Sequence, residues 1–399
     1  MPYDVIVVGA RCAGASTAML LAREGHRVLL LDRMKLPSDL RLSTHLVWQA
    51  GAGRLAEWGL LDAVRESGCP ALATVCLDLG PFALVGRPVP FNGVGDALAP
   101  RRHLLDGVLQ QAAETAGVEL RDDCTVEDLL WDDDRVVGVR CRSGGTSVSE
   151  RASIVVGADG FHSRVAKLAD APEYNNQAPL EGTYFSYWSG VPIDGVTIYL
   201  REGRVCYGWK TNDDLALIGV NWPTTEFGAV RDDIDTNFYS SVETVAPDVA
   251  ESLREGERVD RWIGTTVAGF YRKPYGPGWA LVGDAGYNKD PGTAQGISDA
   301  FRDAQLLADA VHAGLAGDGV LFDQLAGYQA ARDEASGPMY AFTNQLATLG
   351  PVDPQMQALF GALVGNEEQT DRFFGVLAGT VPLPEFLSPE NVQTILAAP

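Results

Sequence analysis

The stretch GARCAG over residues 9–14 has the residue types of a phosphate-binding turn, since it follows the apolar run YDVIVV and leads into small and apolar residues with helical spacing. A P-loop requires a lysine that reaches the β and γ phosphates, and Ala15 stands at that position. A dinucleotide-binding turn requires glycine for the tight bend and for close packing of helix on strand, and Gly9 and Gly14 meet these needs. Arg11 departs from the pattern, because the middle glycine normally lets a pyrophosphate approach closely.

The elements around this turn form a βαβ unit. Residues 3–8 predict a buried strand, the next residues predict a helix that ends near Gly25, and RVLLLDR over residues 27–33 predicts a second buried strand. The helix N-terminus offers N–H groups and partial positive charge to a pyrophosphate, and Asp32 is placed to accept hydrogen bonds from a ribose. Taken alone, one substituted fingerprint also fits a glycine-rich turn of another α/β fold.

Two later stretches repeat the strand, turn and helix. SIVVGADG over residues 153–160 places Asp159 and Gly160 after a strand, and WALVGDAGYNKDPGTAQGIS over residues 279–298 places Asp284 and Pro291 after another. Between these pieces, aromatic and β-branched residues alternate, which favours an antiparallel sheet that could wall a ligand pocket. The last part of the chain has helical patterning.

Together the three stretches resemble the fingerprints of the FAD-dependent group A aromatic monooxygenases, the para-hydroxybenzoate hydroxylase-like fold, in order and spacing over residues 3–320. The resemblance implies an α/β protein with a Rossmann-like, GR2-type FAD-binding domain around a parallel sheet, an antiparallel-sheet substrate domain and C-terminal helices. We expect the discontinuous FAD-binding domain to comprise residues 1–69, 99–174 and 271–325. The substrate-binding domain would comprise residues 70–98 and 175–270, and the helical segment residues 326–399.

The resemblance also implies which residues contact the cofactor. They are Gly9, Arg11, Cys12, Ala13, Gly14, Asp32, Arg33, Arg41, Arg102, Asp159, Gly160, Gly283, Asp284, Pro291, Ala294, Gln295, Gly296 and Ile297. Asp32 would bind the adenosine ribose, Arg102 the ribityl and phosphate region, and Asp284 the ribityl hydroxyls. Pro291 would lie near the isoalloxazine ring, with the following helix start directed at flavin N1 and O2. Two positions depart from the family, which commonly has glycine at Ala294 and often histidine at Tyr287.

Arg11 suggests a hypothesis of its own. We expect its backbone to follow the usual path and its guanidinium to turn toward the FAD phosphates or the flavin edge. Arg33 and Arg41 would contact the adenine or pyrophosphate side, although either could be a surface arginine. Arg102 could instead belong to a solvated basic helix start, with Arg101 as a second choice for its role.

The implied reaction is that of an FAD-dependent monooxygenase. NADPH or NADH would transiently reduce FAD, O2 would form a flavin C4a-hydroperoxide, and oxygen would pass to an aromatic or polyketide-like small molecule. A flavin reductase of the geranylgeranyl reductase type and a flavin-binding protein without turnover remain as alternatives. The halogenase motif W-x-W-x-I-P is absent from the sequence, which disfavours a halogenase.

Candidates to line the substrate pocket are the aromatic side chains and a histidine of the second domain and the loop after Asp32. They are His45, Trp48, Tyr184, Tyr187, Trp188, Tyr207, Trp209 and Trp222. Aromatic residues on a sheet are often core residues rather than ligand contacts, so the sequence leaves both roles open.

The composition limits the classes of molecule that the protein is expected to bind. The 31 basic and 53 acidic residues among 399 give a net charge of -22, which repels nucleic acid and anionic membranes. Six scattered cysteines fit neither a zinc site nor a disulfide framework, so we expect no metal. With no signal-peptide pattern and no apolar run of about 18 residues, we expect a cytoplasmic protein, a possible homodimer, that acts on a small molecule and O2.

Overall fold

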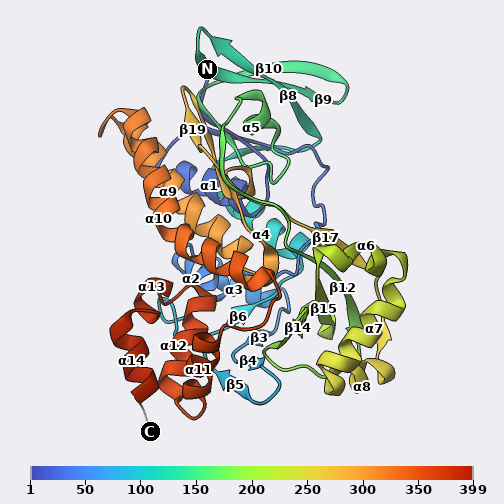
Figure 1. Ribbon diagram of the computed structural model, residues 1–399. Coiled ribbons are helices and arrows are strands. Elements are labelled where there is room, and N and C mark those ends of the chain that lie inside the picture. The colour runs from blue at the N-terminus through green and yellow to red at the C-terminus, as the bar shows by residue number, and fades with distance from the viewer. Residues whose placement is uncertain (1, 398–399) are drawn as a thin grey trace.

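A parallel sheet forms the centre of the first unit, in the computed structural model that describes residues 2–397 (Figure 1). Its strand order is β19-β20-β10-β1-β2-β7, and these neighbours are parallel except for β19, which is antiparallel to β20. The strands are β1 (Tyr3–Val8), β2 (Val28–Leu31), β7 (Glu119–Arg121), β10 (Thr146–Gly157), β19 (Tyr275–Gly276) and β20 (Trp279–Leu281). Val8 pairs with both Leu31 and Gly157, and Gly157 pairs with Leu281. Because β1, β10 and β20 are parallel and end level with one another, the three fingerprint turns leave the sheet at one edge.

Layers cover both faces of this sheet, as its continuous apolar strands require. On one face, Val5 and Val7 pack with helices; on the other, Ile6 and Val8 pack with a hairpin and α5. The first layer contains α1 (Cys12–Arg23), α2 (Gln49–Glu57), α3 (Leu61–Glu66), α4 (Arg102–Thr115) and α9 (Gly296–Ala316). The second layer contains β8 (Cys124–Asp132), β9 (Arg135–Ser143) and α5 (Arg164–Leu168).

A second, mostly antiparallel sheet lies below the first in Figure 1, in the order β16-β12-β15-β14-β13-β4-β5, with β17 also paired to β12. Its strands are β4 (Val75–Asp78), β5 (Ala83–Gly86), β12 (Glu181–Ser189), β13 (Val196–Arg201), β14 (Arg204–Lys210), β15 (Ala216–Pro223), β16 (Glu257–Arg258) and β17 (Ile263–Thr266). The pairing of β13 with β4 is parallel. Short strands connect the units: β3 (Ala71–Leu72) with β6 (Ala97–Leu98), and β11 (Glu173–Gln177) with β18 (Gly269–Arg272) and β21 (Tyr287–Asn288).

Helices α6 (Thr224–Asp232), α7 (Ile234–Val245) and α8 (Pro247–Glu255) cover one face of the second sheet. The aromatic and β-branched composition of residues 175–270 predicts strands throughout, although Phe238, Val242 and Val245 already have helical spacing. Apolar residues of these helices, such as Phe238 and Val242, share a core with Trp188 and Trp222 of the sheet.

The C-terminal helices pack partly on the other face of the second sheet. They are α10 (Leu321–Ala347), α11 (Pro354–Leu363), α12 (Glu367–Ala378), α13 (Leu383–Phe386) and α14 (Pro389–Ala397). Phe374 and Phe386 share a core with Leu77 and Phe185 of the sheet. Helix α10 also packs on α9, and the expected boundary between residues 325 and 326 falls inside it. The structure confirms the predicted architecture of parallel sheet, second sheet and C-terminal helices. Within residues 2–397, every helix is too short or too polar to cross a lipid bilayer.

Candidate functional site

The first fingerprint turn depends on two glycines. Gly9 has a φ of 105°, and a Cβ there would lie 2.4 Å from the carbonyl oxygen of Ala158. A Cβ on Gly14 would lie 1.8 Å from the carbonyl oxygen of Gly9. Arg11, by contrast, has a φ of -106° and a ψ of -164°, extended values open to any residue. The backbone therefore follows its path without the middle glycine.

Asp32 holds this turn from the end of β2. Its Oδ2 accepts a hydrogen bond from the Ala10 N–H at 2.8 Å, and its Oδ1 accepts one from the Met34 N–H at 2.8 Å. The carboxylate is fixed between the turn and the following loop, and it lines the same cavity as Gly9. An oriented carboxylate at this place can also accept hydrogen bonds from ribose hydroxyls.

Helix α4 supports the turn from the side through residues spaced by four. Gln110 donates to the Ala10 carbonyl at 2.7 Å, and the guanidinium of Arg102 donates to both oxygens of Asp106 at 3.0 and 3.2 Å. The Asp106 carboxylate also accepts hydrogen bonds from the Arg11 guanidinium at 3.3 Å and from the Cys12 thiol at 3.4 Å. Residues four apart lie on one face of a helix, so Arg102, Asp106 and Gln110 meet the turn together.

The second and third fingerprints meet the first at the sheet edge. Asp159 caps α5, because its carboxylate accepts the N–H groups of Arg164 at 2.6 Å and Val165 at 3.1 Å. A Cβ on Gly283 would lie 2.7 Å from the Cβ of Ala13, so this glycine permits the close approach of the third turn to α1.

Asp284 projects into the cavity rather than into the packed core. Desolvation in the cavity wall raises its pKa to about 6, and the positive charge of Arg102 opposes this rise. Since the carboxyl is open to water that enters the cavity, a ligand that displaces this water strengthens the effect.

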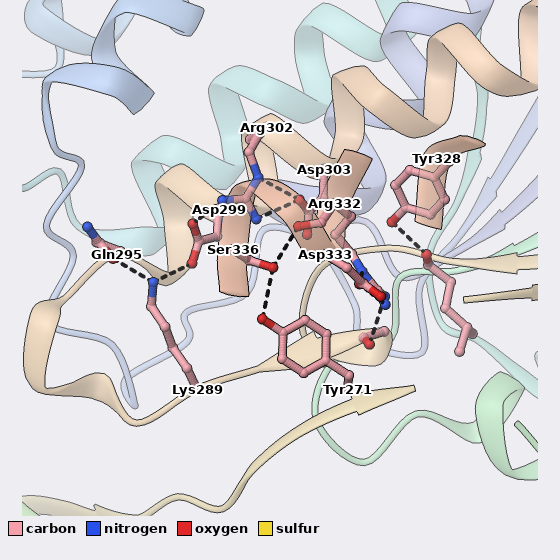
Figure 2. A network of polar contacts seen from close by, with 12 residues as sticks. Tyr271, Lys289, Gln295, Asp299, Arg302, Asp303, Tyr328, Arg332, Asp333 and Ser336 are labelled. Carbon is pink, nitrogen blue, oxygen red and sulfur yellow. Dashed lines mark hydrogen bonds and ion pairs between the residues drawn. The ribbon is translucent and has the colours of Figure 1, made fainter. Parts of the chain in front are cut away.

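A network of buried charges holds the loop after Asp284 against α9 and α10 (Figure 2). The ammonium group of Lys289 lies 2.7 Å from Asp299 and donates to Gln295 at 2.5 Å. Arg302 bridges Asp299 and Asp303 at 2.7 Å each. From α10, the fully buried Arg332 donates to the carbonyl of Gly286 at 3.0 Å, while Ser336 hydrogen bonds Tyr271 at 2.9 Å. Burial lowers the pKa of Lys289, and Asp299 opposes this shift.

The fingerprints enclose one cavity of about 1200 Å³. Its lining includes these expected residues: Gly9, Arg11, Cys12, Ala13, Asp32, Arg33, His45, Arg102, Asp159, Gly160, Gly283, Asp284, Pro291, Ala294, Gln295, Gly296 and Ile297. Gly14 lies behind the turn, and Arg41 is exposed and faces Asp260 at 3.8 Å, away from the lining. Ligand pockets are typically about 300–1,000 Å³. The glycine cradle, the fixed carboxylates and the volume therefore fit an extended dinucleotide such as FAD, with room for a second ligand.

The aromatic candidates divide between the two faces of the second sheet, because alternate residues of a strand point to opposite faces. Thr183 and Phe185 of β12 line the cavity, and Tyr187 on the same face hydrogen bonds His45. The other aromatic candidates do not line the cavity. Tyr184, Trp188 and Trp222 pack beneath α6–α8, Tyr207 and Trp209 stack on each other, and Trp48 donates to the Thr293 carbonyl at 3.0 Å. Among the candidates, His45 lines the cavity and Tyr187 lies one hydrogen bond behind it.

Comparison with known proteins agrees with this site. The family model described as "FAD binding domain" matches residues 2–342. The chain belongs to this family of FAD-binding proteins. It is an FAD-dependent oxidoreductase, and the expected resemblance to the monooxygenases is confirmed.

Individual relatives of this FAD-dependent oxidoreductase differ in reaction. It is 26% identical to 6-methylpretetramide 4-monooxygenase from Streptomyces rimosus, over 75% of this chain and 73% of that protein. It is 28% identical to digeranylgeranylglycerophospholipid reductase 1 from Methanococcoides burtonii, over 78% and 74% of the two chains. The structure of the flavin-dependent brominase Bmp2 superposes with a TM-score of 0.81 at 20% identity, covering 99% of this chain and 97% of that one. The likeness to the brominase is one of fold.

Sequence reasoning missed several residues of the oxidoreductase that shape the site. The Asp106 carboxylate interacts with Arg11, Arg102 and Cys12. In the sequence, only its spacing of four residues from Arg102 indicates such a contact. Glu181 at the start of β12 lies close to Asp290, which precedes Pro291. Burial, followed by the charge of Asp290, raises the pKa of Glu181 well above its usual value. Only folding brings these two carboxyls together, so neither residue carries a local signal.

Arg11 gives a test of its predicted role. Its guanidinium lines the cavity but is held by Asp106 and by the Ser38 hydroxyl at 3.1 Å. We expect Arg11→Ala and Arg11→Gly to raise the FAD dissociation constant by about three- to tenfold, the effect of losing one charge-assisted hydrogen bond. Titration of apoprotein with FAD, followed by flavin fluorescence, measures this. Unchanged affinity in both variants would mean that arginine is merely tolerated at this position.

Proposed function

We propose that the protein is an NAD(P)H-consuming monooxygenase that inserts oxygen into an aromatic or polyketide-like small molecule. The relative from Streptomyces rimosus, a 6-methylpretetramide 4-monooxygenase, supports this class of substrate. FAD, when bound, supplies the redox chemistry: it takes electrons from NADPH or NADH and activates O2. The protein's task is then to bind, orient and exclude water. A cytoplasmic location and a possible homodimer belong to the same proposal.

The observation that carries this proposal is the continuity of the cavity. Its lining includes Gly9 and Asp32 of the first fingerprint and also Thr183 and Phe185 of the second sheet. Pro291 lies in the same lining. A substrate held against β12 would therefore face the flavin without a protein layer between them.

Within this proposal, the residues of the three fingerprints divide the cofactor between them. The α1 N-terminus and Arg102 would hold the phosphates, Asp32 the adenosine ribose and Asp284 the ribityl chain. The start of α9 at Gly296 would face the isoalloxazine, where its N–H groups stabilise negative charge on the ring. The Asp159 carboxylate accepts hydrogen bonds from the start of α5, so it would contribute to FAD binding by holding the turn in position.

The test is turnover by FAD-loaded protein with NADPH or NADH over a panel of polycyclic phenols and quinones. We expect the substrate to accelerate NAD(P)H oxidation, with matching O2 consumption and a product that gains one oxygen atom. A flavin that stays oxidised with both nicotinamides across the panel would contradict the proposal and indicate a binding protein.

A reductase of isoprenoid double bonds is the second candidate. The 28% identity to the digeranylgeranylglycerophospholipid reductase from Methanococcoides burtonii favours it. The same protein, reduced without O2 and given a geranylgeranyl lipid, would then yield a product with two more hydrogens and reoxidise its flavin. Anaerobic turnover of that lipid, without oxygenation of the aromatic panel, would replace the monooxygenase by this reaction.

A further inference from the structure

His45 occupies an unusual place in the cavity wall. It lies in the loop between β2 and α2, is almost completely buried, and has a φ of 64°, in the left-handed region. Two hydrogen bonds close to His45 hold this loop. The Trp209 indole N–H donates to the Thr44 carbonyl at 3.0 Å, and the Trp48 indole N–H donates to the carbonyl of Thr293, which lies in the loop before α9. The histidine is therefore anchored between the second sheet and the loop that bears Pro291.

One nitrogen of the His45 ring is paired and the other is not. Nε2 lies 2.5 Å from the hydroxyl of Tyr187, whose ring is covered by the Arg101 guanidinium at 4.3 Å. Nδ1 is buried and has no hydrogen-bond partner among residues 2–397. A buried polar atom without a partner destabilises the folded protein, so an imidazole with a purely structural role would normally use both nitrogens.

The His45 ring is neutral. Burial, followed by the positive charges of Arg101 and Arg102 and by His103, lowers its pKa well below the usual value. A neutral imidazole has one N–H and one lone pair, and a tyrosine hydroxyl can either donate to Nε2 or accept from it. Nδ1 can therefore accept a hydrogen bond from a hydroxyl or donate one to a carbonyl, whereas a methyl ether offers no proton.

We propose that His45, positioned by Tyr187, hydrogen bonds the substrate through Nδ1 and so selects uncharged aromatic molecules that carry a hydroxyl or carbonyl group. This inference rests on the proposed function for the location of the substrate. It adds His45 as a residue that recognises the substrate's polar group, in a cavity to which β12 contributes Thr183 and the apolar Phe185.

The test measures binding to the oxidised, FAD-loaded protein without any nicotinamide, so it does not depend on turnover. The probes are a naphthol, its methyl ether and a naphthoquinone, titrated against the flavin absorption spectrum. We expect the wild type to prefer the naphthol over the ether by about three- to tenfold, the range of one hydrogen bond, and to prefer the quinone likewise. In His45→Gly, which leaves no side-chain hydrogen-bonding group, both preferences should vanish while the ether still binds. Glycine accepts the left-handed backbone, so the loop keeps its path.

Two further variants separate recognition from structure. Tyr187→Phe removes the partner of Nε2 and should weaken the preference, whereas Tyr199→Phe, which removes a buried hydroxyl bonded to Asp248 beyond the cavity lining, should leave it unchanged. A preference that survives in His45→Gly, a parallel loss of ether binding, or a wild type that binds no probe or binds all equally would overturn the proposal. A naphthol preference without oxygen consumption would instead contradict only the monooxygenase reaction.

Discussion

Replacing Gly14 by alanine is expected to abolish tight FAD binding, with a dissociation constant raised about a hundredfold or more. The new Cβ would lie 1.8 Å from the Gly9 carbonyl oxygen and 3.0 Å from the Cβ of Ala158, and the first of these contacts is backbone that cannot rotate away. The turn must open, so the α1 N–H groups no longer point at one phosphate position. Calorimetric titration of the apoprotein with FAD gives the constant.

The control for this prediction is Gly107→Ala in α4. A Cβ there meets no atom within 4 Å, so the change should keep FAD affinity and stabilise the helix by about 0.5–1 kcal/mol. Wild-type affinity in Gly14→Ala would show that the turn tolerates displacement, and the cofactor would then not depend on this close approach.

Asp106→Ala is expected to lower the free energy of unfolding by about 3–5 kcal/mol, the usual cost of leaving a buried charge unpaired. Asp106 is buried, and its carboxylate neutralises the buried Arg102 and the half-buried Arg11. Without it, two guanidinium groups repel each other beside the phosphate turn. Urea denaturation of the apoprotein measures the loss.

An exposed pair provides the comparison. Asp128 lies 2.6 Å from Arg140 on the β8–β9 hairpin, with both side chains more than 40% exposed. Because water screens such pairs, Asp128→Ala should cost less than about 1 kcal/mol. Equal losses in the two variants would contradict the view that Asp106 stabilises the site through burial. FAD added in excess should restore part of the stability of Asp106→Ala, since phosphates can pair with the freed arginines.

Local patterns were sufficient for much of the fold. The apolar runs with β-branched residues and the turn at Gly9 correctly predicted β1, α1 and β2. Helices α6–α8 were missed because strand-like stretches flank them, although Phe238, Val242 and Val245 have helical spacing.

The site shows the same division. The sequence by itself determined the fingerprints: glycine where a Cβ would collide, and Asp32 and Asp284 at the ends of strands, because these needs are local to each turn. Tertiary structure alone decided that Arg11 pairs with Asp106 and that Glu181 meets Asp290. It also decided that His45, rather than most of the tryptophans and tyrosines, reaches the cavity. Residues that are far apart in the chain show no regular spacing from which their contact could be predicted. Which face of a strand lines the cavity depends on which layer packs against the other face.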